Sequence, residues 1–229
     1  MKSIAIQKSS IAFLKDIAKN NNRDWFNAHK DRYLEAQENM IAFADALLAE
    51  MNKHDKIETE SGKKSLFRIY KDTRFSKDKT PYKSNLSGAF RRATKQLRGG
   101  YYFHIQPGNS FVAGGFWGPE PADLKRIRED IDRNHKDWRK LLTNKALTKT
   151  FGKIIGDQVS TAPKGYSKDH PAIDLLRYKQ FVFKRSFSDK EVMSPALVKE
   201  MNQTFKNLRP FFDYMSEVLT TDLNGVSLV

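Results

Sequence analysis

The spacing of apolar residues changes twice along this chain, and that change restricts the folds it can adopt. Up to about residue 51, and again after Pro119, apolar side chains recur every three or four residues, as in helices with one buried face. Between these regions lie short, aromatic-rich runs separated by Gly, Pro and Asn, which is typical of strands joined by tight turns. We therefore expect an α+β fold, with a mainly antiparallel sheet in the middle of the chain packed by N-terminal and C-terminal helices.

Individual residues predict where these elements begin and end. Expected helices start at Ser9 or Ser10 as cap and end at Asn20–Asn22, run from near Asp24 or somewhat later to about Met51, follow Pro119, follow Asp169 as cap with Pro171 in the first turn, and start at Ser194–Pro195. Expected strands cover 66–70 (Phe67 and Ile69 sharing one face), 84–92, 101–105, 111–117 and 180–187. Ser188 and Glu191 have the spacing of a capping box.

Composition limits the class of protein. The 229 residues include 16 Phe, 8 Tyr and 3 Trp, enough for a hydrophobic core, and we expect a single domain over residues 1–229. The absence of cysteine excludes disulfides, thiolate nucleophiles and cysteine-ligated metals. With no secretory signal pattern and no long apolar run, we expect a cytoplasmic protein without a membrane partner. The sequence alone leaves open the cofactor, whether a metal binds Asp72 or Asp78, and the oligomeric state.

Positive charge is concentrated in one part of the chain. The formal net charge is +14, and the stretch from Lys63 to Arg98 alone holds twelve Lys and Arg against Asp72 and Asp78, a net +10. The rest of the chain contributes only +4. Such a concentration favours an anionic partner over a generally basic surface.

Within this stretch, the segment from Arg68 to Lys83 combines six cations, two acids, hydroxyls and aromatic rings. Arginine forks suit carboxylate or phosphate oxygens, and lysines supply mobile positive charge. We predict an anion-binding loop whose ligand-binding residues are Arg68, Tyr70, Arg74, Lys77, Lys79, Tyr82, Lys83 and, from the neighbouring strand, Tyr102. Asp72 and Asp78 are candidate general bases, orienting groups or metal ligands.

His104 is the histidine with the most informative position. It shares a strand face with Tyr102, opposite Phe103 and Ile105, and a neighbouring strand could bring Arg68 or Tyr70 beside it. A catalytic acid or base and a hydrogen-bonded structural histidine both fit that position. No His-x-x-x-His or His-Glu-x-x-His pair exists, so local metal-ligand spacing is absent.

The segment from Arg68 to Lys83 resembles the signature of a widespread bacterial and fungal family, domain of unknown function 2461. Other parts of the chain agree with this resemblance: Asn21-Asn22, Trp25-Phe26 and Tyr33; Tyr101-Tyr102 and His104; Gly114-Gly115 and Trp117; Gly165-Tyr166 and Asp169-His170-Pro171. The resemblance covers about residues 10–220. It implies a single-domain protein and brings no activity with it.

Three functions remain open on the sequence alone. The first is binding of an anionic ligand, either nucleic acid (a single strand in particular) or a phosphorylated small molecule. The second is an enzyme for an anionic or phosphoester substrate, in which Arg68 and Arg74 hold oxygens, Asp72 or Asp78 acts as base or metal ligand, and His104 donates a proton. The third is a structural ion-pair network without a ligand. The first two predict that Arg68 and Arg74 contact the ligand.

Overall fold

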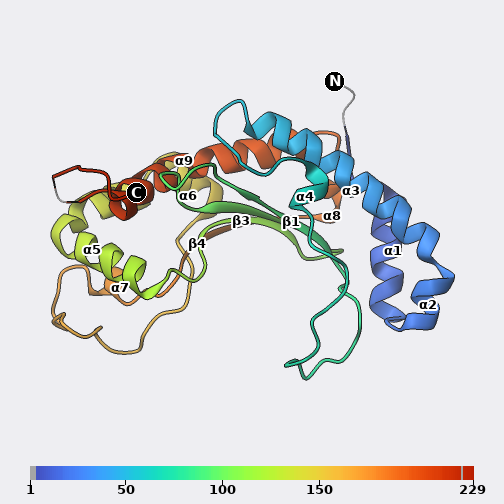
Figure 1. Ribbon diagram of the computed structural model, residues 1–229, viewed down its shortest axis with the longest axis horizontal. Coiled ribbons are helices and arrows are strands. Elements are labelled where there is room, and N and C mark those ends of the chain that lie inside the picture. Colours follow the sequence, from blue (N-terminus) through green and yellow to red (C-terminus); the bar gives the residue numbers. More distant parts are fainter. Residues whose placement is uncertain (1–3, 223) are drawn as a thin grey trace. The chain divides into compact units, whose positions relative to one another are not determined.

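Helices lie at both ends of the chain and a sheet lies between them, as expected for an α+β fold (Figure 1). The computed structural model describes residues 4–222 and 224–229. In chain order the elements are α1 (Lys8–Lys19), α2 (Arg23–Ala28), α3 (Lys30–Met51), α4 (Gly62–Ser65), β1 (Leu86–Arg91), β2 (Gly100–Ile105), β3 (Ser110–Phe116), α5 (Pro121–Leu142), α6 (Lys145–Phe151), α7 (Ile173–Leu176), β4 (Phe181–Phe187), α8 (Asp189–Val192) and α9 (Leu197–Thr220). The strands form one antiparallel sheet in the order β1-β2-β3-β4, which confirms the predicted fold class.

The chain divides into two compact units, each made of several sequence segments. Unit 1 comprises residues 1–91, 102–112 and 186–203, and it contains α1–α4, β1, most of β2 and α8. Unit 2 comprises residues 92–101, 113–185 and 204–229, and it contains α5–α7, most of β4 and most of α9. The predicted single domain over 1–229 stays a prediction.

In unit 1 the two faces of β2 have different surroundings. Phe103 is fully buried and its ring meets Phe43 of α3 edge-on, with 5.8 Å between ring centroids. Tyr102 and His104 lie on the opposite face, where their side chains hydrogen-bond to each other. The predicted face assignment of this strand is therefore confirmed, because alternation along a strand sends neighbouring side chains to opposite sides.

The predicted ends of the N-terminal helices, at Asn20 and Met51, are confirmed, but the helices begin differently from the prediction. The N-cap of α1 is Gln7, without a side-chain cap, and Ser10 is instead buried with its hydroxyl donating to Asn39 Oδ1 at 3.0 Å. The single helix expected up to Met51 is broken at His29, whose φ of −123° and ψ of 28° are not helical. The sequence near Ser10 could not show that this serine does not cap the helix, because its hydroxyl bonds to Asn39, a buried residue of α3.

In unit 2 the core forms around α9 and the kinked helix α5. Phe205 and Phe212 of α9 pack on the ring of Tyr101, at 4.8 and 5.0 Å between centroids. Trp138 of α5 is fully buried against Phe181. Asn134 interrupts α5 with φ −117° and ψ 28°, which redirects the last turns of that helix.

Two further boundary predictions need correction, and one is confirmed. Asp169 does not cap α7: the helix starts at Ile173, and His170 Nδ1 accepts a hydrogen bond from the Ala172 N–H at 3.0 Å. Residues 66–70 form only isolated antiparallel bridges. The Ser188–Glu191 capping box is present and opens α8. Within the described residues, no helix has the length and apolarity needed to cross a membrane.

Candidate anion-binding hairpin

The segment from Arg68 to Lys83 folds into an irregular antiparallel hairpin between α4 and β1, drawn in teal to green in Figure 1. The Lys71 N–H donates to the Pro81 carbonyl at 2.9 Å, and the Lys83 N–H donates to the Ile69 carbonyl at 2.8 Å. We call residues 68–83 the basic hairpin and residues 72–80 its tip. Proline lacks an N–H, so Pro81 can accept but not donate here, and the pairing stays short.

The base of the basic hairpin is held in the core of unit 1. Ile69 and Tyr82 are 1% and 4% exposed, and the ring of Tyr82 stacks on Phe26 of α2 with 4.1 Å between centroids. Asn21, in the turn between α1 and α2, donates to the Tyr82 carbonyl at 2.8 Å and accepts from the Tyr82 N–H at 3.0 Å. Tyr82, predicted as a ligand contact, is therefore an anchoring residue.

The predicted pattern of residues 66–70 fails at Phe67. Strand alternation predicts Phe67 and Ile69 on one face, yet Phe67 is 49% exposed while Ile69 is buried. Phe67 instead lies beside Tyr102 of β2, with 6.3 Å between ring centroids. The irregular pairing, with bridges only at the two ends of this run, releases Phe67 from the alternation.

At the tip, Asp72 is paired with Arg74. The Arg74 Nε and Nη2 atoms donate to the two Asp72 carboxylate oxygens at 3.0 and 2.7 Å. These hydrogen bonds from Arg74 hold the pKa of Asp72 below its ordinary value. The Arg74 side chain is 77% exposed, so this pair is not the buried network expected of a purely structural motif.

Asp78 is bound by Lys71 and Thr80. Lys71 Nζ contacts Asp78 Oδ2 at 2.6 Å, and the Thr80 N–H and hydroxyl donate to Asp78 Oδ1 at 2.9 and 2.7 Å. The Lys71 ion pair, followed by the Thr80 hydrogen bonds, keeps the pKa of Asp78 far below its usual range. Both candidate bases are thus neutralised by cations of the same hairpin.

Two cations of the hairpin, Arg68 and Lys83, have no carboxylate partner in the part of the chain that the structure describes. Lys83 Nζ donates to the Arg68 carbonyl at 3.0 Å and lies 5.6 Å from the centroid of the Phe67 ring. Burial, and then the positive charge of Arg68, lower the pKa of the Lys83 amine. Across the described ranges 4–222 and 224–229, neither Arg68 nor Lys83 forms an ion pair.

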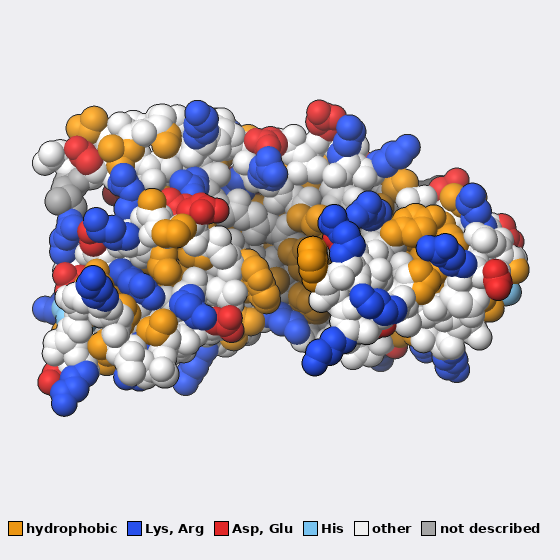
Figure 2. Space-filling model, turned by 60° about the horizontal axis from the view of Figure 1, so that its bottom comes forward, with side chains coloured by type: hydrophobic (Ala, Val, Ile, Leu, Met, Phe, Trp, Pro, Cys, Tyr) orange, Lys and Arg blue, Asp and Glu red, His pale blue; other side chains and the backbone are white. Residues whose placement is uncertain are grey.

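The two remaining lysines of the tip have no carboxylate partner within the described residues either. Lys79 Nζ donates to the Thr73 carbonyl at 2.9 Å, and Lys77 is exposed. Figure 2, in which the side carrying the hairpin comes forward, shows Lys and Arg side chains intermixed with exposed hydrophobic ones. The arrangement is an open cationic surface.

His104 and Tyr102 form a hydrogen-bonded chain on the adjoining strand face. The Tyr102 hydroxyl lies 2.9 Å from His104 Nδ1, and His104 Nε2 lies 2.8 Å from the Gln106 side-chain oxygen. Because that amide oxygen only accepts, the contact requires a proton on Nε2 of the imidazole. The ring is 9% exposed and stacks on Phe111 at 4.7 Å.

Nine of the predicted site residues lie in the basic hairpin. Tyr102 of β2 lies next to the hairpin, where its ring is beside Phe67. Tyr70 turns the other way, toward Phe26 and Tyr82, at 6.2 and 5.4 Å between centroids. On the face of β2 that carries Tyr102 and His104, the ring of Phe67 lies beside Tyr102, in place of Tyr70. The sequence did not predict this exposed position of Phe67, because an apolar side chain in a strand is typical of a buried residue.

The charge of the Lys63–Arg98 stretch does not form one patch. Arg92 is 1% exposed, with its Nη2 atom 2.8 Å from Asp213 and its guanidinium over the Phe212 ring. Arg98 pairs with Asp123. These arginines belong to unit 2, so the net +10 overstates the charge available to a ligand at the hairpin.

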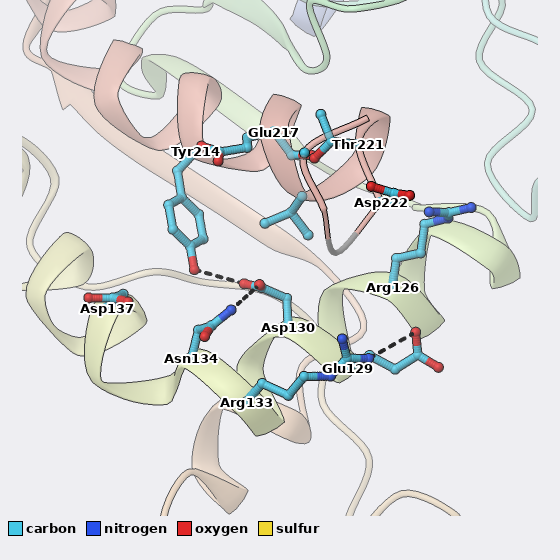
Figure 3. A pocket seen from close by; sticks show the side chains of 12 residues that line it. Arg126, Glu129, Asp130, Arg133, Asn134, Asp137, Tyr214, Glu217, Thr221 and Asp222 are labelled. Carbon is cyan, nitrogen blue, oxygen red and sulfur yellow. Dashed lines mark hydrogen bonds and ion pairs between the residues drawn. The ribbon is translucent and has the colours of Figure 1, made fainter. Parts of the chain in front are cut away.

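A second polar site, in unit 2, has no counterpart in the sequence prediction (Figure 3). A cavity of about 500 Å³ lies between α5 and the end of α9. At its wall, the Tyr214 hydroxyl and the Trp138 Nε1–H both donate to Asp130 Oδ2 at 2.7 Å, and Asn134 donates to Asp130 Oδ1 at 2.7 Å. Burial, the Asp130 hydrogen bond and nearby carboxylates raise the pKa of Tyr214 strongly. The residues that line this cavity are too far apart in the sequence to form a motif.

No group of three or more His, Cys, Asp or Glu side chains in the described residues could hold a metal ion. The profile of a family described as conserved hypothetical protein, DUF2461, matches residues 9–214. The chain belongs to this family, as the motif between Arg68 and Lys83 predicts. Searches of curated proteins and of solved structures find no match.

Proposed function

We propose that the protein binds a phosphate-bearing anionic ligand through the basic hairpin, with Arg68 and Lys83 as the principal contacts. The observation that carries this proposal is that the amine of Lys83 lies against the backbone of Arg68, and neither residue has a carboxylate partner in the described residues. Burial, and then the positive charge of Arg68, lowers the pKa of Lys83, and a bound anion would favour the charged form of the amine.

The state of the two acids supports binding rather than catalysis. A general base is most effective when its pKa lies near the working pH. Asp72 and Asp78 both have lowered pKa values, because Arg74 and Lys71 respectively hold them in ion pairs. Each would have to leave its partner before it could accept a proton or bind a metal.

The openness of the hairpin supports the same conclusion. Small-molecule sites are concave and bury most of their ligand. The Arg74 and Asp78 side chains are 77% and 57% exposed, which fits a ligand that lies across the surface. In this proposal Arg74 contributes less than Arg68, because it reaches a ligand only by giving up Asp72.

Calorimetric titration with inorganic polyphosphate at increasing NaCl concentration tests the proposal. We expect binding that weakens steeply with salt, because each phosphate contact displaces counterions. The double variant Arg68→Ala/Lys83→Ala should weaken binding by about tenfold or more, since a hydrogen bond to a charged group contributes about 1.5–3 kcal/mol.

The matched control is Lys164→Ala/Lys168→Ala, which removes two positive charges from exposed positions of unit 2. It should leave the affinity within about twofold of the wild type. Equal losses in the two double variants, or polyphosphate binding that does not respond to salt, would show that the hairpin is not the binding site.

A further inference from the structure

Three large aromatic side chains of the hairpin region remain exposed, and this points to more than phosphate recognition. Phe75 at the tip is 96% exposed, Tyr70 is 51% exposed and Phe67 is 49% exposed. Leaving such a ring in water gives up the favourable free energy of burying it. Single exposed apolar residues are ordinary, and Tyr70 turns toward Phe26 and Tyr82. The rings of Phe67 and Phe75 are the two that suit a partner with apolar faces.

Two of these rings are each paired with a cation. Lys83 Nζ lies 5.6 Å from the Phe67 centroid, and Arg74 Cζ lies 5.9 Å from the Phe75 centroid. The surface therefore repeats one unit, a ring beside a cationic side chain, near the base of the hairpin and again at its tip, where the cation also pairs with Asp72. A single-stranded nucleic acid has the complementary repeat, because each nucleotide joins a flat base to a phosphate.

We propose that the anionic ligand of the hairpin is single-stranded nucleic acid, with unpaired bases stacked on Phe67 and Phe75 and phosphates held by Arg68 and Lys83. This inference rests on the proposed function and narrows its ligand. Stacking tolerates any base, so the geometry assigns no sequence preference. Tyr102, at 6.3 Å from Phe67, extends the stacking surface onto β2.

Two other ligand classes fit the same residues less well. Membrane insertion needs more than one apolar anchor, and the tip offers one ring, flanked in sequence by Arg74 and Ser76. A compact phosphorylated molecule could meet the cations near Phe67, but it would leave Phe75 without a partner. Only an extended ligand uses both ring–cation pairs.

The test compares two oligomers of equal length with the full-length protein: labelled oligodeoxythymidine, and an abasic strand that keeps the phosphates and lacks the bases. Fluorescence anisotropy should give tighter binding to oligodeoxythymidine by about fivefold or more, the lower limit expected for one stacked base. Phe67→Leu and Phe75→Leu keep an apolar side chain and remove the ring. Each should lower affinity for oligodeoxythymidine by about fivefold and leave binding to the abasic strand unchanged.

Trp117→Leu is the matched control, because Trp117 is 72% exposed and belongs to unit 2. It should leave both affinities unchanged, and thermal melting should show that all three variants fold. Equal affinity for the two strands, or no effect of either Phe variant, would overturn base stacking. Polyphosphate binding would in that case still support the proposed function.

Failure of every polyanion to bind would instead remove the proposed function itself. Vesicles of phosphatidylcholine and phosphatidylglycerol test whether the ligand is instead an anionic membrane surface. Binding to these vesicles that depends on Phe75, together with no binding of oligodeoxythymidine, would overturn the inference in favour of an anionic membrane surface.

Discussion

The side-chain amide of Asn21 forms two hydrogen bonds with the backbone of Tyr82, donating to its carbonyl at 2.8 Å and accepting from its N–H at 3.0 Å. The amide thus occupies the place that a neighbouring strand would take beside the hairpin. This contact, together with the stacking of Tyr82 on Phe26, fixes the base from which the exposed tip extends.

Asn21→Ala should loosen the hairpin and destabilise the protein. Loss of two hydrogen bonds, with the backbone groups of Tyr82 left unpaired, should lower the free energy of unfolding by about 1–3 kcal/mol in urea denaturation. Asn20→Ala is the comparison, because the Asn20 amide makes one exposed hydrogen bond, to the Asp16 carbonyl. An equal loss in both variants would contradict a specific role for Asn21.

The ion pair at Asp78 should be visible in its titration. Its pKa is lowered in the folded state, so the order it gives the tip is present above the unfolded value of about 3.9 and is lost as the pH falls below it. NMR of the Asp78 carboxyl carbon should show a midpoint below that value. Lys71→Ala should move the midpoint upward, and an unchanged midpoint would contradict the pairing.

Tyr214 should make stability sensitive to alkaline pH. Its pKa is raised in the folded state, so the stabilisation is full below the unfolded value of about 10 and declines as the pH rises above it. Tyr214→Phe removes the hydrogen bond to Asp130 and should cost about 1–3 kcal/mol near neutral pH, measured by urea denaturation. The difference between wild type and variant should shrink at high pH; a constant difference would argue against this mechanism.

Gly115 should tolerate no side chain. Its φ is +138°, and a Cβ atom there would lie 2.1 Å from the Phe181 carbonyl oxygen of β4. Gly115→Ala should therefore cost about 2–5 kcal/mol, measured as a fall in melting temperature.

Gly108→Ala is the control for that substitution. Gly108 has a φ of +73° with open space around its Cα, so only backbone strain of about 1–2 kcal/mol is expected. Similar losses at the two positions would show that the contact with β4 is not what excludes a side chain at Gly115.

The sequence by itself determined the features that depend on neighbouring residues. The change of apolar period located the four strands and the long helices, because the period of burial follows directly from helix or strand geometry. The Ser188–Glu191 capping box was readable because both residues act on one helical turn. The motif between Arg68 and Lys83 was sufficient to indicate the family.

Tertiary structure decided what distant residues do to one another. Arg92 is buried and paired with Asp213, 121 residues away. Its charge is therefore absent from the basic surface that the sequence predicts. Tyr82 became an anchor through Asn21, 61 residues away. Phe67 is exposed because irregular pairing of the hairpin breaks the strand alternation. Local periodicity predicts which face of an element is apolar, but only the folded chain determines which partners cover that face.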